Sequence, residues 1–217
     1  MTTEFVINNH ISSMKKKINL SVILPTYNER NNIEPLLSEL LKLSDLFELE
    51  LIVVDDSSTD GTLLIVRDLA QRDRRIRFIS RVGRSGLSSA IKEGCLCATG
   101  EILAIMDTDG QHEVNTVSNG IQKLIRNNLD FVVGSRFLDN SAIRGLSEAR
   151  KGGSSIANSL AKLSLPREYS HMTDFMSGCI VLDRQSCISF IEKIMDSSSK
   201  FFRYSRNLQN FLNRCFF

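Results

Sequence analysis

The sequence predicts an α/β fold in which a mostly parallel, Rossmann-like sheet is flanked by helices. First, short apolar runs alternate with segments of helical periodicity, which is the order of elements in a doubly wound sheet. Second, each of the first four runs is nearly continuous in apolar residues, as expected of strands covered on both faces. Third, polar segments rich in carboxylates follow several of these runs, where open α/β sheets bind their ligands.

Six strands and four helices are expected. The strands are expected at residues 21–25, 49–55, 75–80, 101–107, 130–135 and 179–183. The helices are expected at residues 29–43, 62–71, 88–99 and 114–127. The first helix carries a stripe of leucine and isoleucine at helical spacing, and Asp60 is placed to cap the second.

Length and composition limit the class of protein. The chain has 217 residues and a mass of 24.4 kDa, enough for one domain or one domain with a small appendage. Its net charge of +2 excludes a basic field over the whole protein, so no nucleic-acid partner is expected. The 5 cysteines lack zinc-type spacing, and we expect buried free thiols in a reducing compartment.

The two ends of the chain differ from the middle. Residues 1–19 are polar and lack the apolar core of a signal peptide, so we interpret them as a flexible leader on the cytoplasmic side. No apolar run approaches the ~18 residues of a membrane helix. The main domain is expected over residues 20–185, and residues 186–217 form a separate C-terminal segment.

The segment DTDGQH, at residues 107–112, is the strongest candidate for a metal site. Asp107 and Asp109 alternate directly after an apolar run, and Gln111 continues the same spacing. Oxygen ligands of this kind suit Mg²⁺ or Mn²⁺, which substrate phosphates often help to bind. An EF-hand is excluded because its twelfth position would be Ser118. A solvated turn that caps the helix at Val114 is the alternative interpretation.

The segment DDSSTDGT follows the second predicted strand. Unpaired carboxylates are unfavourable at the end of a buried strand, so Asp55 and Asp56 need partners there. A carboxylate in this position accepts hydrogen bonds from a base or ribose in dinucleotide-binding folds. In the alternative interpretation, Asp55 only caps the turn and Asp60 caps the following helix.

The segment PTYNE follows the first predicted strand. Pro25 restricts the backbone, Tyr27 can lie against a base or sugar, and Glu29 can begin the helix while accepting a ligand hydroxyl. The alternative is a capping segment in which Asn28 is the N-cap.

Six segments together resemble the family 2 glycosyltransferases of the GT-A fold, and most of all the dolichyl-phosphate mannosyltransferases and related polyprenyl-phosphate sugar transferases. The segments are SVILPTYNERNNI, ELIVVDDSSTDGT, GRSGLSSAIKEG, GEILAIMDTDGQH, DFVVGSRF and TDFMSGCIVLDR. The resemblance covers about residues 20–185. One such segment would be weak support, whereas six in the same order are specific.

The resemblance implies a role for each matching residue. The nucleotide-sugar would contact Pro25, Tyr27, Glu29, Val54, Asp56, Arg84, Met106 and Thr108. The metal, Mg²⁺ or Mn²⁺, would be held by Asp107, Asp109 and Gln111. The acceptor phosphate would lie against Arg136, Arg150 and Ser154. The catalytic residues would be Asp107, Asp109 and Arg136.

The implied reaction transfers a hexose, with mannose from GDP-mannose as the first choice, to a polyprenyl phosphate at the cytoplasmic face of a membrane. A divalent metal offsets the charge that grows on the leaving diphosphate. A lipid monophosphate, with a second pKa of about 6, is already ionised and needs no strong base. Direct displacement inverts the anomeric centre. A UDP-sugar donor and a non-catalytic nucleotide-sugar binder are the alternatives.

Three further features are less specific. His112 follows the metal motif and is expected near it, whereas His10 and His171 are interpreted as loop histidines. Asp174 either lies at the sugar end of the site or belongs to a turn in which Gly178 supplies backbone freedom.

The sequence departs from the resemblance after residue 185. Relatives continue with a Phe-x-x-Arg-x-x-Gly-x-Ser-Lys segment that residues 186–217 lack. The end of the chain is instead rich in Phe and basic residues, a composition that suits peripheral contact with an anionic membrane. We favour the other interpretation, a truncated or altered segment.

Overall fold

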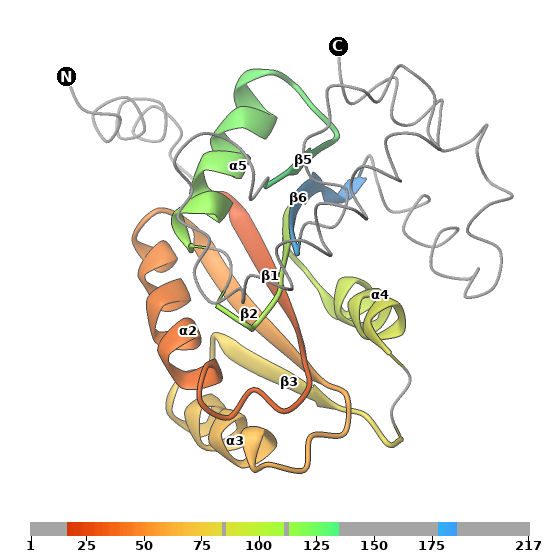
Figure 1. The fold of residues 1–217 in the computed structure, drawn as a ribbon. Coiled ribbons are helices and arrows are strands. Elements are labelled where there is room, and N and C mark those ends of the chain that lie inside the picture. The colour runs from red at the N-terminus through yellow and green to blue at the C-terminus, as the bar shows by residue number, and fades with distance from the viewer. Residues whose placement is uncertain (1–16, 84–85, 111–112, 135–177, 186–217) are drawn as a thin grey trace, which may run out of the picture.

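The computed structural model describes residues 17–83, 86–110, 113–134 and 178–185. Within them, six strands form one sheet in the order β3-β2-β1-β4-β6-β5 (Figure 1). The strands are β1 Asn19–Thr26, β2 Glu48–Asp55, β3 Ile76–Ser80, β4 Ile102–Met106, β5 Phe131–Val133 and β6 Cys179–Asp183. Each overlaps its predicted run. The first strand begins at Asn19, which the sequence had placed at the end of the leader.

Within the described residues, helices connect the consecutive strands from β1 to β5, as predicted. They are α2 Ile33–Leu40, the 3₁₀ helix η1 Leu41–Asp45, α3 Thr62–Arg72, α4 Leu87–Cys97 and α5 Asn115–Arg126. The first helix was predicted to begin at Glu29, and this was wrong. The backbone carbonyl of Glu29 instead accepts hydrogen bonds from the amides of Asn32 and Ile33, both at 3.0 Å, and forms a turn before α2.

The sheet is mostly parallel, which confirms the predicted fold class. Strand β1 pairs in parallel with β2 and β4, and β2 pairs in parallel with β3. Strand β6 runs antiparallel to both of its neighbours, β4 and β5. The direction of β6 matters for the site, because this strand begins at the edge where the parallel strands end.

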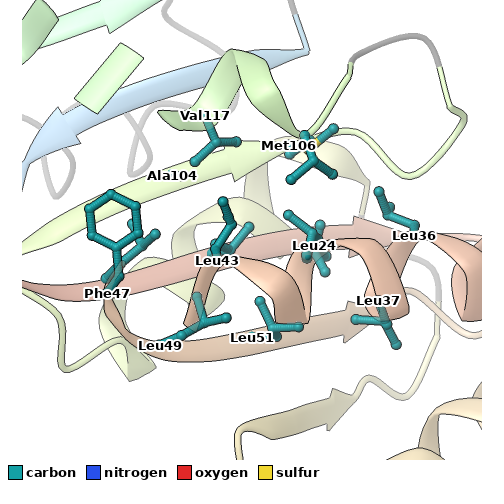
Figure 2. Close-up of a cluster of buried hydrophobic side chains, with 14 of the residues drawn as sticks. Leu24, Leu36, Leu37, Leu43, Phe47, Leu49, Leu51, Ala104, Met106 and Val117 are labelled. Carbon is teal, nitrogen blue, oxygen red and sulfur yellow. The ribbon is translucent and has the colours of Figure 1, made fainter. Parts of the chain in front are cut away.

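Two hydrophobic layers cover the two faces of the sheet. Helices α2, α3 and α5 lie on one face and α4 on the other (Figure 1). On the first face, Leu36 and Leu37 of α2 point towards Leu24 and Leu51 of the sheet (Figure 2). On the second face, α4 lies very close to the sheet. A Cβ at its Gly94 would be 2.5 Å from Ile23 Cγ2, so a larger residue there would push the helix away.

Strand β3 is less buried than predicted. All of the first four strands were expected to be covered on both faces, and β1, β2 and β4 are largely buried. Strand β3 is at the edge of the sheet, and its Arg77 and Phe78 are exposed. The Arg67 guanidinium lies 5.8 Å from the centre of the Phe78 ring and covers part of it.

The cysteines only partly follow the prediction. Cys95 and Cys179 are buried free thiols, and burial raises the pKa of each to about 12. Cys97 is also a free thiol, but it is exposed, so the expectation of burial was wrong for this residue. Cys187 and Cys215 lie outside the described residues. Among the helices that are described, none is both long and apolar enough to cross a membrane.

Candidate functional site

The carboxyl ends of the four parallel strands meet at one edge of the sheet (Figure 1). The loops that follow β1, β2, β3 and β4 therefore lie side by side, as parallel pairing requires. Strand β6 begins at the same edge, because its Cys179 pairs with Met106 at the end of β4. This edge unites segments that are far apart in the sequence.

The loop after β1 is fastened to the loop after β2. The Asn28 amide N–H donates to Ser58 Oγ at 2.8 Å, and the Thr59 N–H donates back to Asn28 Oδ1 at 2.8 Å. The Glu29 N–H donates to Thr62 Oγ1 at 3.0 Å. Asn28 is therefore not the N-cap of the first helix. Its side chain instead holds the neighbouring loop, in a backbone conformation with φ of 55° that asparagine tolerates.

Asp55 and Asp60 each accept a hydrogen bond from a residue two or three positions along the chain, but the N-cap of α3 is Gly61 and not Asp60. Asp55 Oδ2 accepts a hydrogen bond from the Ser58 N–H at 3.1 Å. Asp60 Oδ1 accepts from the N–H of Thr62, the first residue of α3, at 3.0 Å. Burial opposes the shift, but hydrogen bonds from Thr62 and Arg30 outweigh it and lower the pKa of Asp60. These two carboxylates shape the loop.

Asp56 has distant partners instead. Its carboxylate is almost fully buried, with Oδ1 accepting from Arg81 Nη1 at 2.7 Å and Oδ2 accepting from the Gly86 N–H at 2.9 Å. Its own N–H donates to the Thr26 carbonyl at 2.9 Å, which joins the ends of β1 and β2. Asp56 thus lies where three loops of the edge converge.

The sequence interpretation missed Arg81. A signal existed, because a buried carboxylate requires a cationic or hydrogen-bonding partner. Arg81 directly follows β3, the strand next to β2, so the order of the strands places it beside Asp56. That order could not be read from the sequence.

The metal motif lies at the end of β4. Asp107 is partly buried and Asp109 is exposed. Thr108 is buried between them, and its hydroxyl donates to the Pro25 carbonyl at 3.4 Å. This hydrogen bond joins the loop after β4 to the end of β1. The buried Thr108 side chain points into the protein between the two carboxylate residues.

Gly178 fixes the position of Asp107. The Asp107 N–H donates to the Gly178 carbonyl at 2.8 Å, and a Cβ at Gly178 would lie 1.8 Å from Asp107 Oδ2. Gly178 is not among the described glycines with positive φ. The sequence suggested that this glycine supplies backbone freedom. The structure shows instead that it leaves space for the carboxylate.

The donor set at this edge suits a hard divalent cation. Asp107 and Asp109 offer carboxylate oxygens, and Mg²⁺ or Mn²⁺ is typically bound by one or two carboxylates with substrate phosphates. The described residues contain no group of three or more His, Cys, Asp or Glu side chains placed to bind a metal. The predicted third ligand, Gln111, lies outside the described residues.

The other predicted nucleotide contacts fall into two groups. Tyr27 is exposed and Glu29 is partly buried, so both side chains border the edge. The side chains of Val54 and Met106 are fully buried in the two hydrophobic layers. Any contact of these two residues with a ligand would have to use the backbone. Pro25 is buried at the end of β1.

Several predicted residues lie outside the described part of the chain. They are Arg84, Gln111, His112, Arg136, Arg150, Ser154 and Asp174. The structure does describe the residues on either side of the segment 135–177. The Gly134 N–H, just after β5, donates to the Cys179 carbonyl at 2.8 Å, so the chain leaves β5 and enters β6 at the same point of the edge.

The sequence matches the family described as Glycosyl transferase family 2 over residues 21–190, which is most of the chain. The chain belongs to this family. Among curated relatives, the dolichol-phosphate mannosyltransferase of Pyrococcus furiosus is 32% identical over 166 residues, which cover 76% of this chain and 46% of the relative. The chain thus spans less than half the length of this family member.

Solved structures show the same fold. The mannosyltransferase PcManGT of Pyrobaculum calidifontis, in complex with GDP-Man and Mn²⁺, has a TM-score of 0.56 and 24% identity over 81% of this chain and 47% of its own. The glucosyl-3-phosphoglycerate synthase of Mycobacterium tuberculosis, with Mn²⁺, UDP-glucose and phosphoglyceric acid, has a TM-score of 0.63 and 22% identity over 84% of this chain and 62% of its own. The predicted GT-A fold is confirmed.

Proposed function

We propose that this family 2 chain is an inverting, metal-dependent hexosyltransferase that moves mannose from GDP-mannose to a polyprenyl phosphate. The observation that carries the proposal is the convergence of Asp56, Asp107 and Asp109 at the carboxyl edge of one sheet. A nucleotide needs hydrogen-bond acceptors for its base or ribose, and its diphosphate needs cations. This edge offers candidates for both.

The donor would lie across the ends of β1, β2 and β4. Asp56 would accept a hydrogen bond from the base, and Tyr27 and Glu29 would border the nucleoside. Pro25, Val54, Met106 and Thr108 would line the floor, mainly through the backbone. Arg84 would approach the diphosphate.

Asp107, Asp109 and Gln111 would hold Mg²⁺ or Mn²⁺. When bound, the metal would offset the charge that develops on the leaving diphosphate. The similar structures from Pyrobaculum calidifontis and Mycobacterium tuberculosis both contain Mn²⁺ beside a nucleotide-sugar, which supports this choice of ion. The protein's part is to hold the two carboxylates, and Gly178 leaves the space in which Asp107 lies.

The acceptor would be a lipid phosphate bound by Arg136, Arg150 and Ser154. Arginine suits this task because its planar fork matches phosphate oxygens. The name of the Pyrococcus furiosus relative supports the choice of acceptor. Since that acceptor is a membrane lipid, the enzyme would work as a peripheral protein on the cytoplasmic face of a membrane.

A UDP-sugar donor is the second candidate. The Mycobacterium tuberculosis synthase, which has the higher TM-score of the two, holds UDP-glucose. Asp56 does not decide between the bases, because one carboxylate can accept from guanine or from uracil.

A transfer assay tests the proposal. The full chain is incubated with Mn²⁺, dolichyl phosphate in vesicles and either labelled GDP-mannose or labelled UDP-glucose, with and without a chelator. We expect labelled lipid from GDP-mannose that disappears on chelation. Lipid labelling from UDP-glucose alone would establish the second candidate, and binding of donor without any transfer would exclude an enzyme.

Asp109→Ala tests the metal role. We expect transfer to fall about 100-fold or more, as for other losses of charge stabilisation at a transition state. Glu113→Ala is the matched control, since Glu113 is an exposed acid that follows the same loop. Equal activity of the two variants would refute the metal role of Asp109.

A further inference from the structure

Arg81 makes several polar side-chain contacts at the carboxyl edge, although the proposed function assigns it no role. Its side chain is only 10% exposed, and all three guanidinium nitrogens are engaged. Nη1 donates to Asp56 Oδ1 at 2.7 Å, Nη2 donates to Ser89 Oγ at 2.7 Å, and Nε lies 3.1 Å from Glu93 Oε2. One side chain therefore connects the loop after β2 to the first turns of α4.

We propose that Arg81 is a positioning residue for the nucleotide: it holds the Asp56 carboxylate and the start of α4 in the geometry that binds the base. The inference rests on the proposed function, because it assumes that Asp56 accepts a hydrogen bond from the donor. Arg81 itself need not touch the ligand.

The second oxygen of Asp56 is held from the same helix. The Gly86 N–H donates to Asp56 Oδ2 at 2.9 Å, while Arg81 Nη1 donates to the Gly86 carbonyl at 3.3 Å. Gly86 has φ of 88° and ψ of 167°, a conformation open to glycine and disfavoured for other residues. Asp56, Arg81 and Gly86 thus form a closed triangle of hydrogen bonds.

The backbone of Arg81 completes the arrangement. Its N–H donates to the Asp55 carbonyl at 3.0 Å, and its carbonyl accepts from Ser57 Oγ at 2.9 Å. Both sides of Asp56 in the sequence are therefore tied to the same arginine. The orientation of the carboxylate is set before a ligand arrives, which reduces the ordering that binding requires.

Lysine could not reproduce these contacts. Its single ammonium lacks the planar fork that reaches a carboxylate, a hydroxyl and a second carboxylate at once. Removing the cation altogether would leave a buried carboxylate without its charge partner, which is strongly unfavourable. Asp56 would then turn towards other donors, and it would no longer present its acceptor oxygen to a base.

The experiment measures donor binding by calorimetry with the full 217-residue chain, GDP-mannose or UDP-glucose as the probe, and Mn²⁺ throughout. For Arg81→Met and Arg81→Lys we expect the Kd to rise about 10- to 100-fold, the range for losing one hydrogen bond between the donor and a charged group, here the Asp56 carboxylate. In the transfer assay, KM for the donor should rise by a similar factor while kcat changes less. Arg77→Met is the matched control, since Arg77 is on β3, the strand that Arg81 follows, and pairs with Glu50 away from the carboxyl ends of the strands.

Two further measurements separate positioning from general stability. Amide hydrogen exchange should become faster at residues 86–94 in Arg81→Met and stay unchanged there in Arg77→Met. In a double-mutant cycle, Arg81→Met should weaken binding much less in an Asp56→Asn background than in the wild type, because both act through one carboxylate.

The outcomes distinguish this inference from the proposed function. If the wild type binds a donor and Arg81→Lys binds equally well, the inference fails and the proposed function stands. If the two substitutions prove additive in the cycle, Arg81 does not act through Asp56 and the inference fails. If the wild type binds neither nucleotide-sugar, both the proposed function and the inference fail.

Discussion

Arg77 lies near the start of β3 and Arg81 directly follows the end of this strand, and each binds a carboxylate that belongs to β2 or directly follows it. Arg81 pairs with Asp56 at the carboxyl edge, and Arg77 pairs with Glu50 near the start of the strands, with Nη1 and Oε2 2.6 Å apart. Both are pairs of an arginine and a carboxylate. They differ in which segments of the chain the carboxylate joins through its other hydrogen bonds.

Glu50 joins neighbouring strands of the sheet. Its Oε1 accepts from Ser21 Oγ at 2.6 Å and from the Thr99 N–H at 2.6 Å. Ser21 Oγ also accepts from the Gly100 N–H at 2.7 Å, so β1, β2 and the entry to β4 are joined. A Cβ at Gly100 would lie 2.6 Å from the Ser21 nitrogen, which shows how closely these segments pack.

Asp56 holds loops rather than strands. Its partners are the residue after β3 and the glycine before α4, and exposed side chains such as Tyr27 and Asp109 lie along the same edge. One type of pair thus joins the strands at one end of the sheet, and we propose that it supports ligand binding at the other. Substitutions at the two ends should therefore change different observables.

The largest effect is expected from Gly178→Ala at the carboxyl edge. The new Cβ would displace the Asp107 carboxylate, and a shift of about 1 Å in a catalytic group lowers activity about 100-fold. The measurement is transfer activity against Mn²⁺ concentration. Gly120→Ala is the control, because its Cβ would meet the Val181 side chain at 2.9 Å and would affect packing without reaching the carboxylates. Equal losses of activity would contradict the prediction.

At the other end, Glu50→Ala should lower the free energy of unfolding by about 2 kcal/mol, because the donors of Ser21, Thr99 and Arg77 lose a shared acceptor. Urea unfolding measures this. Donor affinity of the folded variant should equal that of the wild type. A loss of donor affinity without a loss of stability would mean that Glu50 serves ligand binding rather than stability, and would contradict the prediction.

The pH dependence of stability sharpens the same contrast. Burial raises the pKa of Glu50, but hydrogen bonds from Ser21, Thr99 and Arg77 outweigh it, so the pKa lies below the ordinary value of 4.5. A lowered folded-state pKa means that the ionised form stabilises the fold above pH 4.5 and that this stability is lost as the pH falls through the folded-state pKa.

The stability gap between the wild type and Glu50→Gln should therefore be constant near neutral pH and shrink as the pH falls below 4.5. Urea unfolding of both proteins at a series of pH values measures the gap. Other carboxylates occur in both proteins, so their titration cancels in the difference. A gap that widens in acid would show that the pKa of Glu50 is raised.

The smallest effect is expected from Arg77→Met. The Arg77 side chain is 47% exposed, and exposed ion pairs contribute about 0.5 kcal/mol. The midpoint of thermal unfolding should fall slightly and donor binding should not change. A loss of stability as large as that of Glu50→Ala would mean that the ion pair, rather than the hydroxyl and amide donors, accounts for the effect of Glu50.

The strands and helices were predictable because their signal is local. The apolar runs of β1, β2 and β4 reflect burial on both faces, and the hydrogen bonds of Asp55 and Asp60 involve residues only two or three positions away. The start of α2 was misjudged because the turn at Glu29 depends on a contact with Thr62, the first residue of α3.

The contacts that organise the site were not predictable, because they depend on strand order and direction. Arg81 meets Asp56 only because β3 lies beside β2. Gly178 lies against Asp107 only because β6 runs antiparallel to β4 and begins beside the end of that strand. A sequence pattern records neither relation, so motif residues were found and their supports were missed.

The hydrogen bond from Gly134 to Cys179 has a consequence for evolution. The chain departs from the sheet and returns to it at a single point, and residues 135–177 between these positions include the candidates for acceptor binding, Arg136, Arg150 and Ser154. An insert anchored in this way can change in length and composition without shifting the register of any strand. The acceptor site that we propose for this segment would therefore be free to vary without disturbing the proposed donor site on β1 to β4.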